Sequence, residues 1–97
     1  MSNDEIKKLI IEECDNIKML LLDKNEKYGN SALFPKRIFS KANAIEQIKV
    51  RIDDKLSRII NLNQNDYGDL EESQLDSAKD LIGYLILMRV AEKIHNS

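Results

Sequence analysis

The sequence predicts an all-α fold: a three-helix bundle with a long ordered loop between its first and second helices, assembling into a homo-oligomer. Apolar residues recur every three or four positions in three segments, which is the period of an amphipathic helix. The composition, 42% hydrophobic and 33% charged, is typical of a folded helical chain. A length of 97 residues allows one domain, residues 1–97.

The first predicted helix covers residues 4 to about 24. Ser2 and Glu5 have the spacing of a capping box, in which each side chain satisfies the other's backbone amide. The helix carries one apolar stripe: Ile6, Leu9, Ile10, Cys14, Ile17, Leu20 and Leu21. Because Cys14 lies on this stripe, we expect it to be a small core residue and not a nucleophile.

Residues 25–41 interrupt the helical pattern. Tyr28-Gly29 is typical of a helix stop, and Pro35 disfavours helix at the residue before it. A connection of this length in a small domain is usually functional or disordered. Three apolar side chains favour an ordered loop anchored to the core: Phe34, Ile38 and Phe39.

The second and third predicted helices cover residues 42–62 and 71–94, with a turn at Tyr67-Gly68 between them. Asn43 and Glu46 again have capping-box spacing. The second helix has one apolar stripe: Ile45, Ile48, Ile52, Leu56 and Ile59. The third is apolar on nearly all sides, through Leu75, Ala78, Leu81, Ile82, Leu85, Ile86, Leu87, Met88 and Val90. Such a helix is buried on nearly all sides, so we expect it to lie in a subunit interface.

Charge and residue counts exclude several classes of function. A formal net charge of −2 provides no positive field for duplex nucleic acid. The longest apolar run, Leu81 to Met88, is far shorter than the roughly 20 residues that span a bilayer, so no membrane partner is expected. One cysteine and one histidine cannot form an intrachain disulfide or a zinc site. Without a secretory leader after Met1, a cytoplasmic protein is expected.

The remaining chemistry centres on carboxylates in two helices. If those helices pack antiparallel, four acidic side chains would form an oxygen-lined site for Mg²⁺ or Mn²⁺: Asp53, Asp54, Asp76 and Asp80. The alternative is ordinary salt bridging of the same acids with nearby lysines and arginines. Gly83 costs a helix roughly 1 kcal/mol relative to alanine. A close backbone approach or a ligand would justify that glycine.

Cations, an aromatic ring and small residues gather where the first helix should end. Tyr28 offers a flat face to a base, Gly29 and Ser31 suit phosphate or sugar oxygens, and Lys27 adds charge. The second helix adds three further cations that would neutralise phosphate: Arg51, Lys55 and Arg58. These residues predict a nucleotide site, and the alternative is a plain helix C-terminus followed by a turn.

Three blocks of the chain carry a resemblance. They are Lys27-Tyr28-Gly29-Asn30-Ser31, then Arg51-Ile52-Asp53-Asp54-Lys55-Leu56-Ser57-Arg58-Ile59, then Asp76 with Asp80-Leu81-Ile82-Gly83-Tyr84-Leu85. Together, across about residues 24 to 91, they resemble the nucleotide-modification-associated domain family, small all-α proteins found largely in phages and bacteria. The resemblance implies a nucleotide-associated protein that, if phage-encoded, works in the host cytoplasm.

The last block is also similar, more distantly, to MazG-like all-α nucleotide pyrophosphohydrolases. In that superfamily, Glu-x-x-Glu on one helix and Glu-x-x-Asp on a later helix hold Mg²⁺ on a nucleotide phosphate. Here Ser77 stands three residues before Asp80, with an acid at Asp76 instead, and Ser57 stands three residues after Asp54. The acidic quartet is therefore incomplete.

Three functions remain open from the sequence. The first is a metal-dependent nucleotide pyrophosphohydrolase, with the four aspartates holding Mg²⁺ or Mn²⁺ and the metal activating the attacking water. The second is a non-catalytic sponge that sequesters a nucleotide signal of host antiviral defence, which the incomplete quartet favours. The third, drawn from the excess apolar surface alone, is a helical protein-interaction module.

Overall fold

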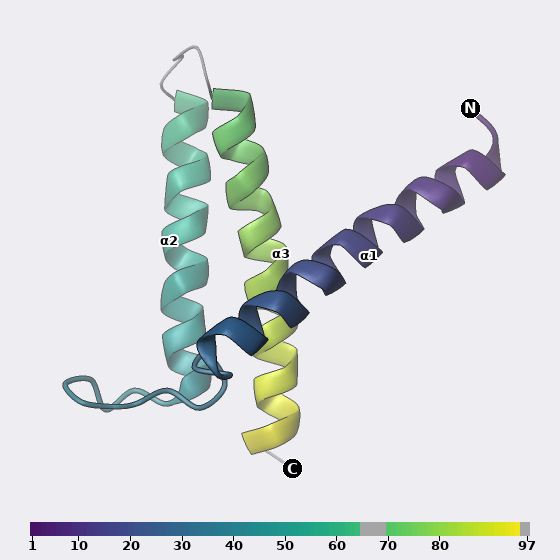
Figure 1. The fold of residues 1–97 in the computed structure, drawn as a ribbon. Helices are drawn as coiled ribbons and strands as arrows, with labels where there is room; N and C mark the ends of the chain where they lie inside the picture. Colours follow the sequence, from purple (N-terminus) through teal and green to yellow (C-terminus); the bar gives the residue numbers. More distant parts are fainter. Residues whose placement is uncertain (65–69, 96–97) are drawn as a thin grey trace.

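The computed structural model describes the backbone of residues 1–64 and 70–95 and the side chains of residues 1–61 and 75–95. These ranges contain three helices, α1 (Asn3–Tyr28), α2 (Ala44–Gln64) and α3 (Leu70–His95), and no strand (Figure 1). The predicted all-α fold is confirmed. The predicted turn at Tyr67-Gly68 lies outside the described residues. No helix in the described ranges combines the length and apolar character needed to cross a bilayer.

The two ends of α1 are fixed by local hydrogen bonds. The Ser2 hydroxyl accepts a hydrogen bond of 3.1 Å from the Glu5 amide, as the capping spacing predicts. At the other end Gly29 adopts a left-handed backbone, with φ 60° and ψ 38°, which glycine tolerates best. The Asn30 amide then donates to the Asn25 carbonyl at 3.1 Å. This turn ends α1 at Tyr28, whereas the sequence predicted an end near residue 24.

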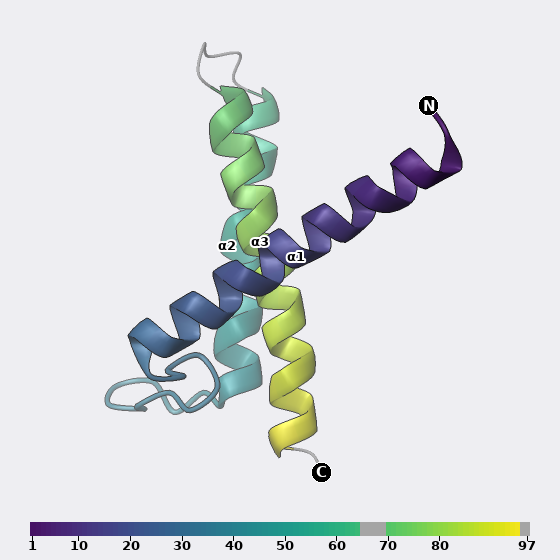
Figure 2. The same cartoon turned by 45° about the vertical axis from the view of Figure 1, so that its right-hand side comes forward.

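Helices α2 and α3 form an antiparallel hairpin that holds the core, and both views show them side by side (Figures 1 and 2). The Asn43 side chain caps α2 by accepting a hydrogen bond of 2.9 Å from the Glu46 amide. The core cluster lies at the end of the hairpin nearest the α1–α2 loop. Its buried members are Leu33, Ile48, Leu87 and Ala91.

Helix α1 crosses α3 at a steep angle instead of lying along it (Figures 1 and 2). A Cβ atom built on Gly83 would lie 3.1 Å from Leu21 Cδ2, so the missing side chain lets the two helices approach. Of the two explanations expected for Gly83, a close backbone approach or a ligand, the structure shows a close approach made by the Leu21 side chain. Beyond the crossing, the N-terminal half of α1 leaves the hairpin. Cys14 is therefore exposed, and its expected core position is wrong because α1 has already left α3 at that point.

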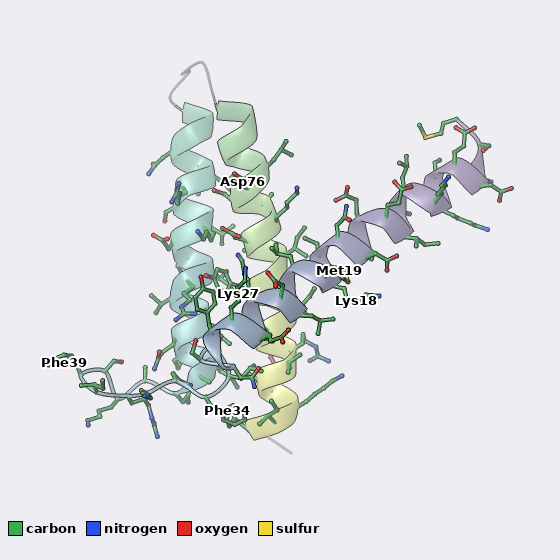
Figure 3. The ribbon with its side chains drawn as sticks, in the orientation of Figure 1. Lys18, Met19, Lys27, Phe34, Phe39 and Asp76 are labelled. Atoms are coloured by element: carbon green, nitrogen blue, oxygen red, sulfur yellow. The ribbon has the colours of Figure 1, made fainter. Side chains whose placement is uncertain are left out.

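The loop between α1 and α2 is anchored by a residue other than the three expected. Leu33 is buried, and its carbonyl accepts a hydrogen bond of 2.8 Å from His95 Nε2 at the end of α3. Phe34 is 58% exposed, and its ring makes a T-shaped contact with the His95 ring at a centroid distance of 5.5 Å. Ile38 and Phe39 are 73% and 97% exposed, and Phe39 lies at the tip of the loop (Figure 3). The prediction that these three residues anchor the loop is wrong, because the chain leaves the core after Leu33 and their side chains are exposed.

Candidate functional site

A pocket of about 280 Å³ opens where the C-terminal end of α1 lies over α2 and α3. Its lining comes from all three helices and from the start of the loop. The apolar part is Leu20, Leu21, Ala32, Gly83 and Leu87. The polar part is Lys24, Asn25, Tyr28, Ser31, Arg51, Lys79, Asp80 and Tyr84. This pocket exists because α1 crosses at Gly83 and brings its last two turns over the hairpin.

Asp80 lies at the centre of an ion-pair network that joins the three helices. Its Oδ1 atom is 3.5 Å from Lys24 Nζ on α1, and its Oδ2 atom is 3.2 Å from Lys55 Nζ on α2. The side chains of Asp80 and Lys55 are 29% and 18% exposed, so water screens this pair only in part. The carboxylate therefore holds two ammonium groups at the pocket.

Positive charge dominates the pocket. Lys24, Arg51 and Lys79 line it, while Asp80 is the single acidic residue in the lining. The Arg51 guanidinium also lies over the Tyr84 ring, with Cζ 5.9 Å from the centroid, a distance at which the two attract. The lining therefore holds three cations and one carboxylate, and a fourth cation, Lys55, pairs with that carboxylate. The surplus charge favours an anionic ligand.

Aromatic and hydrogen-bonding groups complete the pocket. Tyr28 is the last residue of α1. It is 68% exposed, so its ring is available to stack on a ligand. Tyr84 is half-buried on α3 beneath Arg51. Ser31 and Asn25 add a hydroxyl and an amide to the lining. The arrangement combines flat faces, small polar groups and cations within one opening.

Part of the nucleotide-binding set expected from the sequence is brought together here. Tyr28, Ser31 and Arg51 line the pocket, and Lys55 reaches it through Asp80. Three others do not line it: Lys27, Gly29 and Arg58. Lys27 pairs with Asp23 at 3.2 Å on the surface of α1 (Figure 3). Gly29 acts by ending α1, and Arg58 is exposed further along α2.

The four aspartates expected to hold a metal are not brought together. Asp80 lies in the pocket, whereas Asp53, Asp54 and Asp76 are exposed outside its lining. Asp76 is nearer the start of α3 (Figure 3). Throughout the described residues, no three His, Cys, Asp or Glu side chains are grouped as metal ligands. Among the described residues, the pocket therefore offers one carboxylate, whereas Mg²⁺ and Mn²⁺ are usually held by several oxygen ligands.

Four polar residues of the pocket were not among the ligand contacts expected from the sequence: Lys24, Asn25, Lys79 and Tyr84. Periodicity gives the faces of a helix but not the angle at which it crosses another, and that angle brings Lys24 to Asp80. One sequence signal was available, since Lys24 continues the stripe of Ile17 and Leu21 at three- and four-residue spacing. A lysine on an apolar stripe indicates a buried or site-facing partner.

Comparisons of this chain with protein-family models, with curated proteins and with solved structures find no match.

Proposed function

We propose that this protein binds a nucleotide or a nucleotide-derived anion in the pocket at the α1 crossing, without changing the ligand chemically. The observation that carries the proposal is the surplus of cations in the pocket, where Lys24, Arg51 and Lys79 line the surface with one carboxylate and two tyrosines. Lysine and arginine bind phosphate oxygens through charge-assisted hydrogen bonds. Aromatic faces stack on bases without requiring a particular base.

The two lysines paired with Asp80 are the natural phosphate contacts. In the free protein, Lys24 and Lys55 share the Asp80 carboxylate at 3.5 and 3.2 Å. An arriving phosphate would compete with Asp80 for the same ammonium groups. Arg51 and Lys79, which also line the pocket, would meet further phosphate charge. The base or sugar would then lie against Tyr28 at the opening.

Sequestration is favoured over hydrolysis because the pocket lining holds a single carboxylate, Asp80. Metal-dependent hydrolysis of a nucleotide phosphate uses several oxygen ligands to hold the metal ions that activate the attacking water. Asp80 instead pairs with Lys24 and Lys55. Binding without turnover suits a protein that removes a nucleotide signal, such as one used in host antiviral defence. The cytoplasm is where such a ligand would be met.

The test is titration calorimetry with nucleoside mono-, di- and triphosphates and cyclic dinucleotides, each in EDTA and in MgCl₂. We expect at least one of them to bind in EDTA and to be recovered intact. Lys24→Gln should weaken that binding by roughly ten- to hundredfold, the equivalent of about 1.5–3 kcal/mol for a charged hydrogen bond. Lys27→Gln is the matched control, because Lys27 pairs with Asp23 and does not line the pocket.

Two results would contradict the proposal. Binding that requires Mg²⁺ for every compound would return the site to the metal-dependent class. Release of phosphate or pyrophosphate during incubation, measured by chromatography of the products, would show turnover and not sequestration.

A further inference from the structure

The N-terminal half of α1 forms an arm, residues 3–16, that projects away from the rest of the chain (Figures 1 and 2). Within α1, all of which is described, Ile17 is the only buried residue. The arm is nevertheless helical from its Ser2 cap onwards. In proteins, most of the stability of a helix comes from tertiary packing of its apolar face. A helical arm of this kind is therefore expected to pack on another surface.

The arm presents an apolar stripe that continues the one used inside the chain. Ile17 and Leu21 lie on the side of α1 that faces α3, and Leu21 reaches Gly83. Ile6 and Ile10 extend the same stripe at helical spacing, with 42% and 58% of their surfaces exposed. Cys14 lies on this stripe and is also exposed.

A face of matching length and opposite charge is exposed on α3. Leu75, Ile82 and Ile86 share one side of that helix, 62%, 46% and 42% exposed. From Leu75 to Ile86 the helix rises about 17 Å, against about 21 Å for the whole arm. The arm carries five acidic residues and two lysines, whereas the α3 face is flanked by exposed lysines at Lys79 and Lys93.

We propose that the arm of one copy lies on this α3 face of a second copy, whose own arm returns the contact. The occupant is a second copy because the same chain supplies both the acidic apolar arm and the basic apolar face. Such a contact is symmetric and closes as a dimer. The α3 face shares Lys79 with the proposed ligand pocket, but the two residues that the test replaces, Ile10 and Ile86, do not line that pocket.

Light scattering of the full chain at tens of micromolar tests the proposal. The unmodified protein should have twice the monomer mass of 11.2 kDa. Ile10→Asp and Ile86→Asp should each return it to the monomer mass, since a buried unpaired charge would weaken association by more than about a hundredfold. Val50→Asp is the matched control and should stay dimeric, because Val50 is 65% exposed on α2, away from both surfaces.

Two further measurements separate loss of association from loss of folding. Ile10 and Ile86 are exposed within one chain, so each variant should keep a cooperative thermal melt and an unchanged nucleotide affinity. The Cys14 thiol should react with a maleimide more slowly in the unmodified dimer than in Ile10→Asp. A monomeric unmodified protein would overturn the proposal, as would a dimer that survives both substitutions. A monomer whose arm binds lipid vesicles instead would also overturn it.

Discussion

Replacing Asp80 with asparagine should change the ligand affinity in opposite directions for the two ways in which this site could work. The change keeps the shape of the side chain and removes its charge. If the pocket binds anions through its cations, Asp80 is a competitor for Lys24 and Lys55, and Asp80→Asn should strengthen ligand binding. If Asp80 held a metal on a phosphate, the same change would weaken binding.

The size of the gain follows from the ion-pair distances. Asp80 lies 3.2 and 3.5 Å from the two lysine nitrogens, so a phosphate on their other side would be about 6 Å from the carboxylate. Removing one unit charge at about 6 Å is worth roughly 0.7 kcal/mol at a dielectric of 80 and roughly 2.8 kcal/mol at 20. Ligand binding should therefore tighten by about three- to a hundredfold.

Stability should move the other way in this variant. Lys24 is 48% exposed, so losing its ion pair costs less than about 1 kcal/mol. Lys55 is 18% exposed, and leaving its ammonium without a carboxylate costs about 1–3 kcal/mol. In a domain of this size each kcal/mol lowers the melting temperature by roughly 4–8 °C. We expect a lower melting temperature together with a higher affinity.

Titration calorimetry and thermal melting of the same preparation measure both effects. Asp76→Asn is the matched control, because Asp76 is an exposed aspartate on α3 outside the pocket. It should change neither quantity. Weaker binding by Asp80→Asn, at unchanged binding by the control, would refute the competition argument. A lower melting temperature with unchanged affinity would make Asp80 a purely structural residue.

Three further substitutions probe the base contact, the helix crossing and the core. Tyr28→Ala should cost about 1–3 kcal/mol of nucleotide affinity in calorimetry, while melting stays nearly constant because Tyr28 is 68% exposed; equal losses of both would assign it a packing role. Gly83→Val should overpack the contact with Leu21 at a cost of about 1–3 kcal/mol and weaken ligand binding as α1 is displaced, and unchanged binding would contradict this. Ile48→Ala should lower the free energy of unfolding, measured in urea, by about 2–5 kcal/mol, because Ile48 is 1% exposed. Val50→Ala, at a residue that is 65% exposed, should lower it by less than about 0.5 kcal/mol.

Local features of the fold were predictable from the sequence because their causes are local. The Ser2 and Asn43 caps depend on a side chain and an amide three residues apart. The stop at Gly29 depends on a backbone conformation that glycine tolerates best. The cost of a glycine within α3 indicated either a close approach or a ligand at Gly83, and the Leu21 side chain approaches it closely. Each of these inferences needed only a short stretch of chain.

The crossing angle of α1 was not predictable, and the site depends on it. The same stripe would bury Cys14 if α1 lay along α3, yet the steep crossing leaves it exposed and brings Lys24 to Asp80. The anchoring of the loop was equally unpredictable because it depends on a tertiary contact. Leu33 forms a hydrogen bond with His95, which lies 62 residues further along the chain. The loop motif indicated Tyr28 and Ser31. Both line the pocket because they lie at or just after the end of α1, which forms one side of it.

The most direct test of the central claim is mass spectrometry of small molecules that the protein retains. Unmodified protein and a Lys24→Gln/Arg51→Gln variant are each incubated with a bacterial nucleotide extract containing EDTA, separated by gel filtration and denatured. We predict that the unmodified protein releases an intact phosphate-bearing nucleotide compound and that the variant, equally folded by circular dichroism, does not. Recovery of the same compounds in the same amounts from both proteins would contradict the assignment of the pocket as the ligand site.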